Sequence, residues 1–411
     1  TITIGDGINR VFGDEGSLEV DANGITTVQS LNGNVGGTEE ITVGAGFNVV
    51  VGGAASDAII VDGAVDGARG MVIGDNGILQ IGADGLLDSI ASSDYSFGDS
   101  DVITLTSGTN AVIGGAGDDR ITAGSGINTV LGDDGEAIFD GTDIQLIQTT
   151  NSGGGGADVI TLEGGTNTVL AGADSDTITI GDGVNRVFGD EGKLEVDLDG
   201  ITTVQSLNGN VGGTETITVG AGFNVVVGGA ASDAIVVDGA AEGARGMVIG
   251  DNGILQIGAD GLLDSIASSD YSSGDSDVIT LTSGTNAVIG GAGDDRITAG
   301  SGINTVLGDD GEAIFDGTDI QLIQTTNSGG GGQDQITLDG GTNTVIAGSE
   351  ADTITIGDGI NRVFGDEGSL EVDANGITTV QSLNGNVGGT EEITVGAGFN
   401  VVVGGAASDA I

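Results

Sequence analysis

The chain has 411 residues, 84 of them glycine, with no proline, cysteine or histidine, and a formal net charge of −54. This composition excludes a disulfide scaffold, zinc or iron centres built from thiolate or imidazole ligands, and a basic nucleic-acid surface. A hydrophobic fraction of 37% argues against disorder, whereas nine Phe and two Tyr cannot fill a wide core. We therefore expect a thin, stacked interior.

The first predicted elements are short strands that alternate with glycine-rich turns. Each strand has one apolar residue between two outward residues, the period of a β-strand. Strand centres lie eighteen residues apart in three pairs: Ile41 and Ile59, Ile103 and Ile121, and Ile160 and Ile178. Nine residues thus form one turn and one strand, and eighteen form one coil of a flattened spiral. Helical spacing is absent, and no apolar run is long enough to span a membrane.

Longer segments interrupt the spiral after the sequences GDEG, GDNG and GDDG. They cover residues 17–33, 78–92 and 136–150, and each has two β-prone runs around an Asn-Gly or Asp-Gly turn. This pattern predicts β-hairpins. They recur every second coil and would stand about 10 Å apart along one edge. Such a row could pack on itself, brace the spiral or meet a neighbouring filament, or it could be surface decoration.

One nine-residue pattern, G-G-x-G-x-D-x-U-x with U a large apolar residue, carries the chemistry. It is met in full by residues 114–122, 153–161, 290–298 and 329–337, with decayed copies between them. The glycines allow positive φ angles and expose main-chain carbonyl groups, and the sixth-position Asp adds a carboxylate beside them. Both are hard oxygen ligands of the kind that Ca²⁺ prefers.

The chain also repeats on a larger scale. Residues 1–176 align without gaps on 177–352, and each copy contains three modules of about 59 residues; residues 353–411, identical to 1–59, begin a third copy. We interpret these as three segments of one continuous rod. A chain that begins and ends in the same sequence is expected to be an excerpt of a longer tandem array.

The nonapeptides resemble the RTX, or haemolysin-type, calcium-binding repeats of secreted bacterial proteins. The resemblance implies a parallel β-roll, a β-solenoid with two nonapeptides per coil and Ca²⁺ held between turns. Carried over position by position, it assigns calcium ligands to the turns. They are Asp57, Asp101, Asp119, Asp158, Asp176, Asp233, Asp277, Asp295, Asp334, Asp352 and Asp409, with Gly115, Gly117, Gly291 and Gly293. Glu39, Glu215 and Glu391 replace this Asp in three coils, which puts calcium binding there in doubt.

Two further sets of polar residues have two interpretations each. Asp133, Asp309 and their counterparts Asp14, Asp75, Asp190, Asp251 and Asp366 lie in the GD-x-G segments. They could complete a calcium site or be ordinary turn residues. Asn9, Asn48, Asn110, Asn128, Asn167, Asn185, Asn224, Asn286, Asn304, Asn343, Asn361 and Asn400 take the sixth position at the opposite edge. Stacked amides can hydrogen-bond to one another along the axis, or they can offer oxygens to Ca²⁺.

The charge and the repeats together point to function. Sixty-two acids against eight bases must repel one another unless cations intervene, so we expect calcium binding and folding to be coupled. A solvated acidic surface is the alternative. The arginines, about one per module, are expected to pair with carboxylates. With no His, Cys or G-x-S-x-G serine, an enzyme is not expected.

Near-identical repeats favour length and stiffness over recognition. The leading hypothesis is a calcium-stabilised structural rod of a large extracellular bacterial protein: an adhesin stalk, surface layer or matrix filament. Calcium ions and neighbouring copies would be its partners, and plentiful extracellular calcium favours the cell surface or a secreted location. The alternatives are a secretion or folding module of an RTX enzyme or toxin, and an ice-binding or ligand-binding solenoid.

Overall fold

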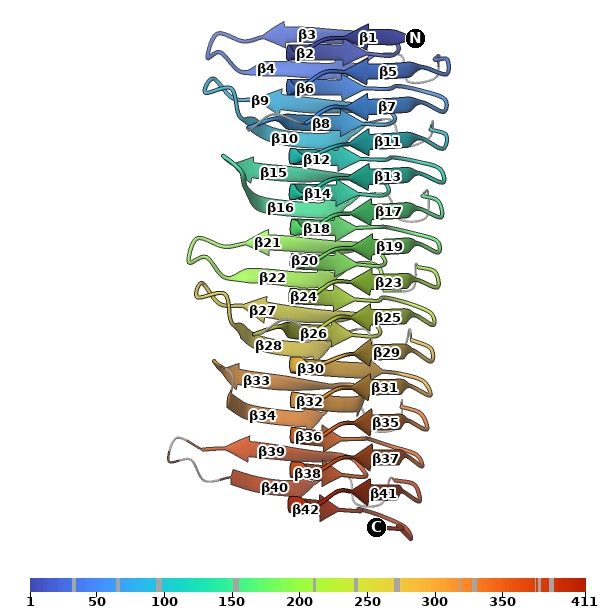
Figure 1. The fold of residues 1–411 in the computed structure, drawn as a ribbon, viewed down its shortest axis with the longest axis vertical. Coiled ribbons are helices and arrows are strands. Elements are labelled where there is room, and N and C mark those ends of the chain that lie inside the picture. The colour runs from blue at the N-terminus through green and yellow to red at the C-terminus, as the bar shows by residue number, and fades with distance from the viewer. Residues whose placement is uncertain are drawn as a thin grey trace. The chain divides into compact units, whose positions relative to one another are not determined.

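The computed structural model describes residues 1–31, 35–63, 67–93, 98–150, 155–209, 212–239, 243–269, 274–317, 319–326, 331–373, 375, 378–383 and 388–411. These residues form strands and turns and contain no helix, and hence no helix that could cross a membrane. The chain divides into two compact units, Thr1–Asp197 and Leu198–Ile411. Each unit contains three sheets, which we call sheets A, B and C (Figure 1).

Sheets A and B of the first unit are parallel and alternate along the chain. Sheet A contains β1 (Ile2–Ile4), β5 (Glu40–Val43), β7 (Ala58–Val61), β11 (Val102–Leu105), β13 (Arg120–Ala123), β17 (Val159–Leu162) and β19 (Thr177–Ile180). Sheet B contains β2 (Gly7–Phe12), β6 (Gly46–Val51), β8 (Arg69–Ile73), β12 (Gly108–Ile113), β14 (Gly126–Leu131), β18 (Gly165–Leu170) and β20 (Gly183–Phe188). Sheet C is formed by β3 (Gly16–Val20), β4 (Thr26–Ser30), β9 (Gly77–Ile81), β10 (Leu87–Ser92), β15 (Gly135–Asp140), β16 (Asp143–Thr149) and β21 (Gly192–Val196).

The second unit has the same three sheets. Sheet A contains β23 (Thr216–Val219), β25 (Ala234–Val237), β29 (Val278–Leu281), β31 (Arg296–Ala299), β35 (Gln335–Leu338), β37 (Thr353–Ile356) and β41 (Glu392–Val395). Sheet B contains β24 (Gly222–Val227), β26 (Arg245–Ile249), β30 (Gly284–Gly291), β32 (Gly302–Asp309), β36 (Gly341–Ile346), β38 (Gly359–Phe364) and β42 (Gly398–Val403). Sheet C contains β22 (Thr202–Ser206), β27 (Gly253–Ile257), β28 (Leu263–Ser268), β33 (Gly311–Asp316), β34 (Asp319–Thr325), β39 (Gly368–Val372) and β40 (Thr378–Ser382).

The predicted coil register is confirmed. In sheet A of the first unit, Ile41 pairs with Ile59, Ile59 with Ile103, and Ile103 with Ile121. These isoleucines are buried, whereas the residues on either side point outward, as the period-two pattern requires. The all-β fold class, a parallel β-roll interrupted by hairpins, is therefore what each unit forms.

The hairpins form a sheet of their own instead of isolated decoration. β4 pairs antiparallel with β9, and β10 pairs antiparallel with β15, so each hairpin adds to the next. Strands in a sheet lie about 4.8 Å apart, so two coils of the roll advance by the same distance as one two-stranded hairpin. This match of spacings explains why a hairpin follows every second coil and why sheet C can run beside sheet B without a gap.

Sheet C covers the outer face of sheet B, and this creates a second apolar layer. Asn48 and Val50 of β6 alternate with Val49 and Val51, yet all four are buried. A β-carbon on Gly77, the first residue of β9, would collide with the side chain of Ile73 in sheet B. A parallel strand buried on both faces has a continuous apolar sequence, as in the VVV of β6. The interior is therefore thicker than the thin stack expected from composition.

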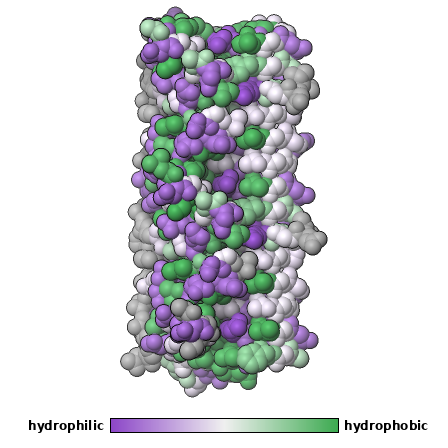
Figure 2. Space-filling model, turned by 90° about the vertical axis from the view of Figure 1, so that its left-hand side faces the viewer, coloured by the Kyte–Doolittle hydropathy of each residue, from purple (hydrophilic) through white to green (hydrophobic). Residues whose placement is uncertain are grey.

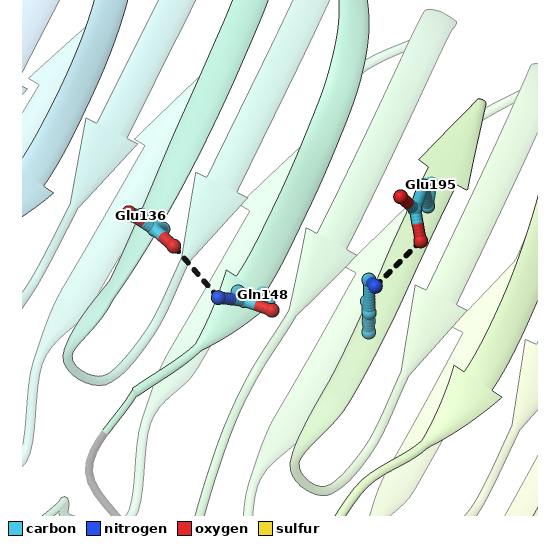
Figure 3. Close-up of polar contacts among 4 residues, drawn as sticks. Glu136, Gln148 and Glu195 are labelled. Atoms are coloured by element: carbon cyan, nitrogen blue, oxygen red, sulfur yellow. Dashed lines mark hydrogen bonds and ion pairs between the residues drawn. The ribbon is translucent and has the colours of Figure 1, made fainter. Parts of the chain in front are cut away.

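The outer face of sheet C is mixed in character. Glu136 of β15 accepts a hydrogen bond from Gln148 of β16 at 2.6 Å, and Lys193 and Glu195 of β21 form an ion pair at 2.5 Å (Figure 3). The view onto the hairpin side shows polar and apolar groups interspersed (Figure 2). Within the described ranges, Lys193 and Glu195 form the one ion pair. The expected pairing of the arginines with carboxylates is therefore wrong for the described part of the chain. Arg120 and Arg296 take outward positions of sheet A, whereas Nε of Arg186 is buried in sheet B without a hydrogen-bond partner among the described residues.

Candidate metal site

The sixth-position aspartates lie in the turn that leads from sheet B or sheet C into sheet A. Asp119 directly precedes β13 and Asp158 directly precedes β17, so the rigid strand that follows fixes each side chain. Ten of the eleven predicted aspartates are buried, and Asp119 is only 1% exposed. Asp409, in the last coil, is half-buried.

In the ten buried aspartates, one carboxylate oxygen accepts a hydrogen bond from the main chain of the preceding coil. The Oδ1 atom of Asp119 accepts a hydrogen bond of 2.7 Å from the amide of Asp101, and Oδ1 of Asp158 accepts one of 2.7 Å from the amide of Asp119. The second unit repeats this, with Oδ1 of Asp334 accepting from the amide of Asp295 at 2.9 Å. The aspartates thus form an axial ladder, in which each carboxylate links two coils. The other members are Asp57, Asp101 and Asp176, and Asp233, Asp277 and Asp352.

The second oxygen, Oδ2, accepts no hydrogen bond from the described residues, although it is buried at Asp57, Asp101, Asp119, Asp158 and Asp176 and at Asp233, Asp277, Asp295, Asp334 and Asp352. A β-carbon on Gly114 would collide with Oδ2 of Asp119 and with the carbonyl oxygen of Gly132. These two oxygens therefore converge on the side-chain position of a glycine. A buried anionic oxygen without a partner is costly, whereas a carboxylate beside a carbonyl is a donor pair that suits a hard cation.

Burial and mutual repulsion disfavour the charged form of these groups. Burial is the main cause that raises the pKa of Asp101 to about 8, with repulsion from Asp57 and Asp99 added. The pKa of Asp176 rises to about 10 through burial and repulsion from Asp158. Burial also raises the pKa of Asp277 to about 10. A cation at this edge would relieve the same repulsion that raises these pKa values.

A comparison with protein families identifies the same nine-residue repeats. The model of the RTX calcium-binding nonapeptide repeat (4 copies) matches residues 35–66, 95–136, 152–178, 163–193, 211–239, 271–312, 328–354 and 387–411, more than half of the chain. The chain belongs to the RTX calcium-binding repeat family. No curated protein and no solved structure matches it.

The donor set of this RTX chain is made of carboxylates and carbonyl groups together. Within the described ranges, no three acidic side chains gather at one point. A calcium ion held here would therefore depend on main-chain oxygens beside the ladder carboxylates, as the glycine-rich turns allow. Gly115, Gly117, Gly291 and Gly293 lie in these turns and all have positive φ. Their part in binding metal stays a prediction.

Two of the GD-x-G aspartates, Asp133 and Asp309, have a different environment. Oδ1 of Asp133 accepts a hydrogen bond of 3.1 Å from the amide of Gly156, and Oδ2 accepts one of 2.6 Å from the amide of Ala173. Asp309 is bound in the same way, by the amides of Gly332 and Ser349. Each carboxylate thus holds two later turns together with both of its oxygens. This favours the turn interpretation, and a ligand role for Asp133 and Asp309 stays a prediction.

The opposite edge is an amide ladder. Nδ2 of Asn128 donates to Oδ1 of Asn167 at 2.8 Å and to the carbonyl of Gly124 at 3.0 Å. Asn304 repeats both bonds in the second unit. The predicted hydrogen bonding of stacked amides is confirmed. The ladder is interrupted where Gly70 replaces the Asn in β8. Because the amide oxygens along the continuous stretches accept from their neighbours, this edge differs in chemistry from the acidic edge.

The glycine that precedes a hairpin faces the aspartate that follows it. The sequence pattern made Gly153 the first residue of the nonapeptide that contains Asp158, but Gly153 lies outside the described residues. Among the described residues, Gly132, which precedes the hairpin, faces Asp158: a β-carbon there would collide with Oδ2 of Asp158 and with the carbonyl oxygen of Ala171. Gly74 faces Asp101 across another hairpin in the same way. The first glycine of each GD-x-G segment marks this position in the sequence, because it continues the residue spacing of the preceding coil.

In a turn that lacks one of the pattern's glycines, the backbone keeps its conformation but is strained. Ala55 takes the fourth position, which is Gly117 in a full copy, and has a φ of 76°. Positive φ costs a non-glycine residue about 1–2 kcal/mol, whereas glycine adds about 0.5–1 kcal/mol of chain entropy to the unfolded state. We expect Ala55→Gly to raise the free energy of unfolding in calcium by about 0.5–1 kcal/mol, measured by urea denaturation.

Two variants are matched controls for this substitution. Ala54→Gly, in the same turn and without positive φ, is expected to lower the free energy of unfolding by about 0.5 kcal/mol or more. Gly117→Ala would place a β-carbon 2.8 Å from the main-chain carbon of Asp99 and is expected to cost about 2 kcal/mol or more. A loss of stability in Ala55→Gly equal to that in Ala54→Gly would show that the turn is not strained.

Proposed function

We propose that this chain is a calcium-stabilised structural segment of a large extracellular bacterial protein, such as an adhesin stalk, a surface layer or a matrix filament. The observation that carries the proposal is the row of buried carboxylate oxygens without hydrogen-bond partners, one in nearly every described coil. A site that recurs in this way supports a structural ion repeated along the fold more than it supports a single binding or catalytic centre.

Charge gives the physical reason for calcium. A chain with a formal net charge of −54 repels itself strongly, and the ladder concentrates part of that charge in the interior. Divalent cations between coils would neutralise the carboxylates and link the coils, so metal binding would supply folding free energy. Weak sites of this kind fill where calcium is at about 0.1–1 mM or more, which favours a location outside the cell.

The repetition also supports a non-catalytic role for this segment. Its carboxylates recur with the coil, whereas general acid–base catalysis needs one pair of groups set apart from the rest. A secretion or folding module of an RTX enzyme or toxin would use the same calcium chemistry. The near-identity of residues 1–176 and 177–352 favours the structural role, because a folding module has no need of uniform length.

The proposal predicts rod-like scaling. We would measure the radius of gyration by small-angle X-ray scattering for chains of one, two and four of the 176-residue repeats. In calcium, it should grow nearly in proportion to repeat number, whereas a compact globule follows a power of about 0.38 and an unfolded chain one of about 0.6. Chelator should abolish the proportional growth. Globular scaling in calcium would exclude the structural rod and leave only a calcium-binding module.

A further inference from the structure

The outer face of sheet A is flat, exposed and almost uncharged. On β5, β7, β11 and β13, two outward positions alternate with buried ones. In register, the first positions are Glu40, Ala58, Val102 and Arg120, and the second positions are Thr42, Ile60, Thr104 and Thr122. Val102 is 47% exposed and Ile60 is 45% exposed. In a chain with a net charge of −54, these four strands therefore carry one acid, one base, one alanine and otherwise β-branched side chains on this face.

Arg120 and Glu40 have no charged partner within the chain as described. In sheet A, the neighbours of Arg120 at its own position are Val102 and Val159. The described residues offer Arg120 no ion pair, and Glu40 accepts one hydrogen bond, of 3.2 Å, from the hydroxyl of Thr1. The two charges lie three strands apart, about 14 Å at the spacing of a sheet, too far for direct contact.

The charges on this face are complementary to those on a second copy of the same face turned by 180°. A two-fold axis parallel to the strands and midway between β7 and β11 would bring a second copy onto this face with its coils in reverse order. Glu40 would then oppose Arg120 of the second copy, Arg120 would oppose its Glu40, and Ala58 would oppose its Val102. Identical patches meet in this way in a symmetric dimer, and opposite charges that face each other favour one register over the others.

The second unit contains the same spacing at other strands. On β31, β35, β37 and β41 the first positions are Arg296, Gln335, Thr353 and Glu392, so Arg and Glu are again three strands apart. Thr216 stands where the first unit has Glu40, yet Glu392 restores the pair on the other side of Arg296. The side chain of Arg296 lies along the face, since its Nη1 donates to Oε1 of Gln335 at 2.7 Å.

We propose that the outer face of sheet A is a self-association surface, on which a second copy of this chain packs with its coils antiparallel. A contact between two first units would exchange the Glu40–Arg120 pair, and a separate contact between two second units would exchange the Arg296–Glu392 pair. This rests on the proposed function, because side-by-side contact between filaments would be its use. In the first-unit contact six strands overlap, from β1 to β17, over a face about 29 Å long and four residues wide, or about 400 Å². Stable complexes bury about 800 Å² per partner, so one face binds weakly, and tandem arrays would gain by avidity.

The test is a charge swap on the full chain in about 5 mM calcium, with dimerisation measured by sedimentation equilibrium up to about 0.5 mM protein. The Arg120→Glu/Arg296→Glu variant and the Glu40→Arg/Glu392→Arg variant each place like charges opposite one another. Each should raise the dissociation constant at least about tenfold. The fourfold variant with both changes restores every pair and should return the constant to within about threefold of the original. An equimolar mixture of the two twofold variants should form the mixed dimer.

Each other outcome has a definite meaning, because circular dichroism and bound-calcium counts are taken on the same samples. A folded, calcium-loaded chain that remains monomeric would overturn this inference and leave the proposed function in place. A dimer that neither reversal weakens, or that the fourfold variant fails to restore, would also overturn it and direct attention to the hairpin face. A chain that does not fold in calcium would instead contradict the proposed function.

Discussion

Removal of calcium at about pH 8 is expected to unfold both β-rolls, and mild acid is expected to restore β-structure without metal. At about pH 5, protons can take the place of cations on the buried carboxylates. We would record far-UV circular dichroism of the chelator-dialysed chain from about pH 5 to pH 9, and at pH 8 with added calcium. The range begins above the isoelectric point of about 4.1, where solubility is lowest.

The direction follows from the raised pKa values. Burial and repulsion raise the pKa of Asp57 to about 7, that of Asp101 to about 8 and that of Asp176 to about 10 from an ordinary value of 3.8. The folded, metal-free chain therefore binds more protons than the unfolded chain above about pH 4. Its stability is fully present below pH 4 and is lost as the pH rises through about 7 to 10. Calcium should displace these protons, so its binding should release acid.

The result that would contradict this is equally clear. A β-sheet signal in chelator that does not change between about pH 5 and pH 9 would show that the apolar layers and the Asn ladder suffice for folding. The aspartate ladder would then be protonated or solvated without consequence, and its assignment to calcium would be wrong. Magnesium at the same concentration is a control for simple charge screening, because it demands a tighter octahedral shell.

The sequence predicts the coil well, because each coil is determined locally. Nine residues contain both the glycines that permit the turn and the Asp that faces it, and the period-two pattern places isoleucines such as Ile121 inside. Identical coils then stack in register, since a shift by one residue would expose the apolar side. The buried positions of Asp119 and its copies follow from this repetition.

Contacts across the hairpins are not local, and the pattern could not predict them. The pairing of Gly132 with Asp158 requires knowledge that residues 136–150 leave the coil and return to it. The burial of Val49 and Val51 depends on sheet C, whose place over sheet B follows from the match of two coils to two strands. The unpaired arginines were missed because sequence distance to an acid says little about which face each residue occupies.

Substitution of Asp119 and Asp295 by Asn is expected to have opposite effects with and without calcium. These residues occupy equivalent places in the two units, and burial and repulsion from neighbouring aspartates raise the pKa of both well above the ordinary value. Asn keeps the size and the Oδ1 acceptor for the amide of Asp101 or Asp277, but it removes the charge. At about pH 6 in chelator, each substitution should raise the free energy of unfolding by about 1–3 kcal/mol, since the Asp must take up a proton to fold and Asn need not.

In calcium at about pH 8 the same substitutions should be harmful. An amide is a weaker ligand than a carboxylate, and Nδ2 would direct a donor at the position of the cation. We expect calorimetry to count about one ion fewer per substitution, or to find an affinity at least about tenfold lower, and the unfolding temperature in calcium to fall.

The control is Glu19→Gln on the exposed part of β3, which removes one charge without touching the ladder and should change stability by less than about 0.5 kcal/mol in either condition. If Asp119→Asn and Asp295→Asn stabilise the chain in calcium as much as in chelator, the ladder carboxylates destabilise the fold and bind no cation that offsets this effect. Opposite signs would instead mean that the buried charge is kept because a cation requires it.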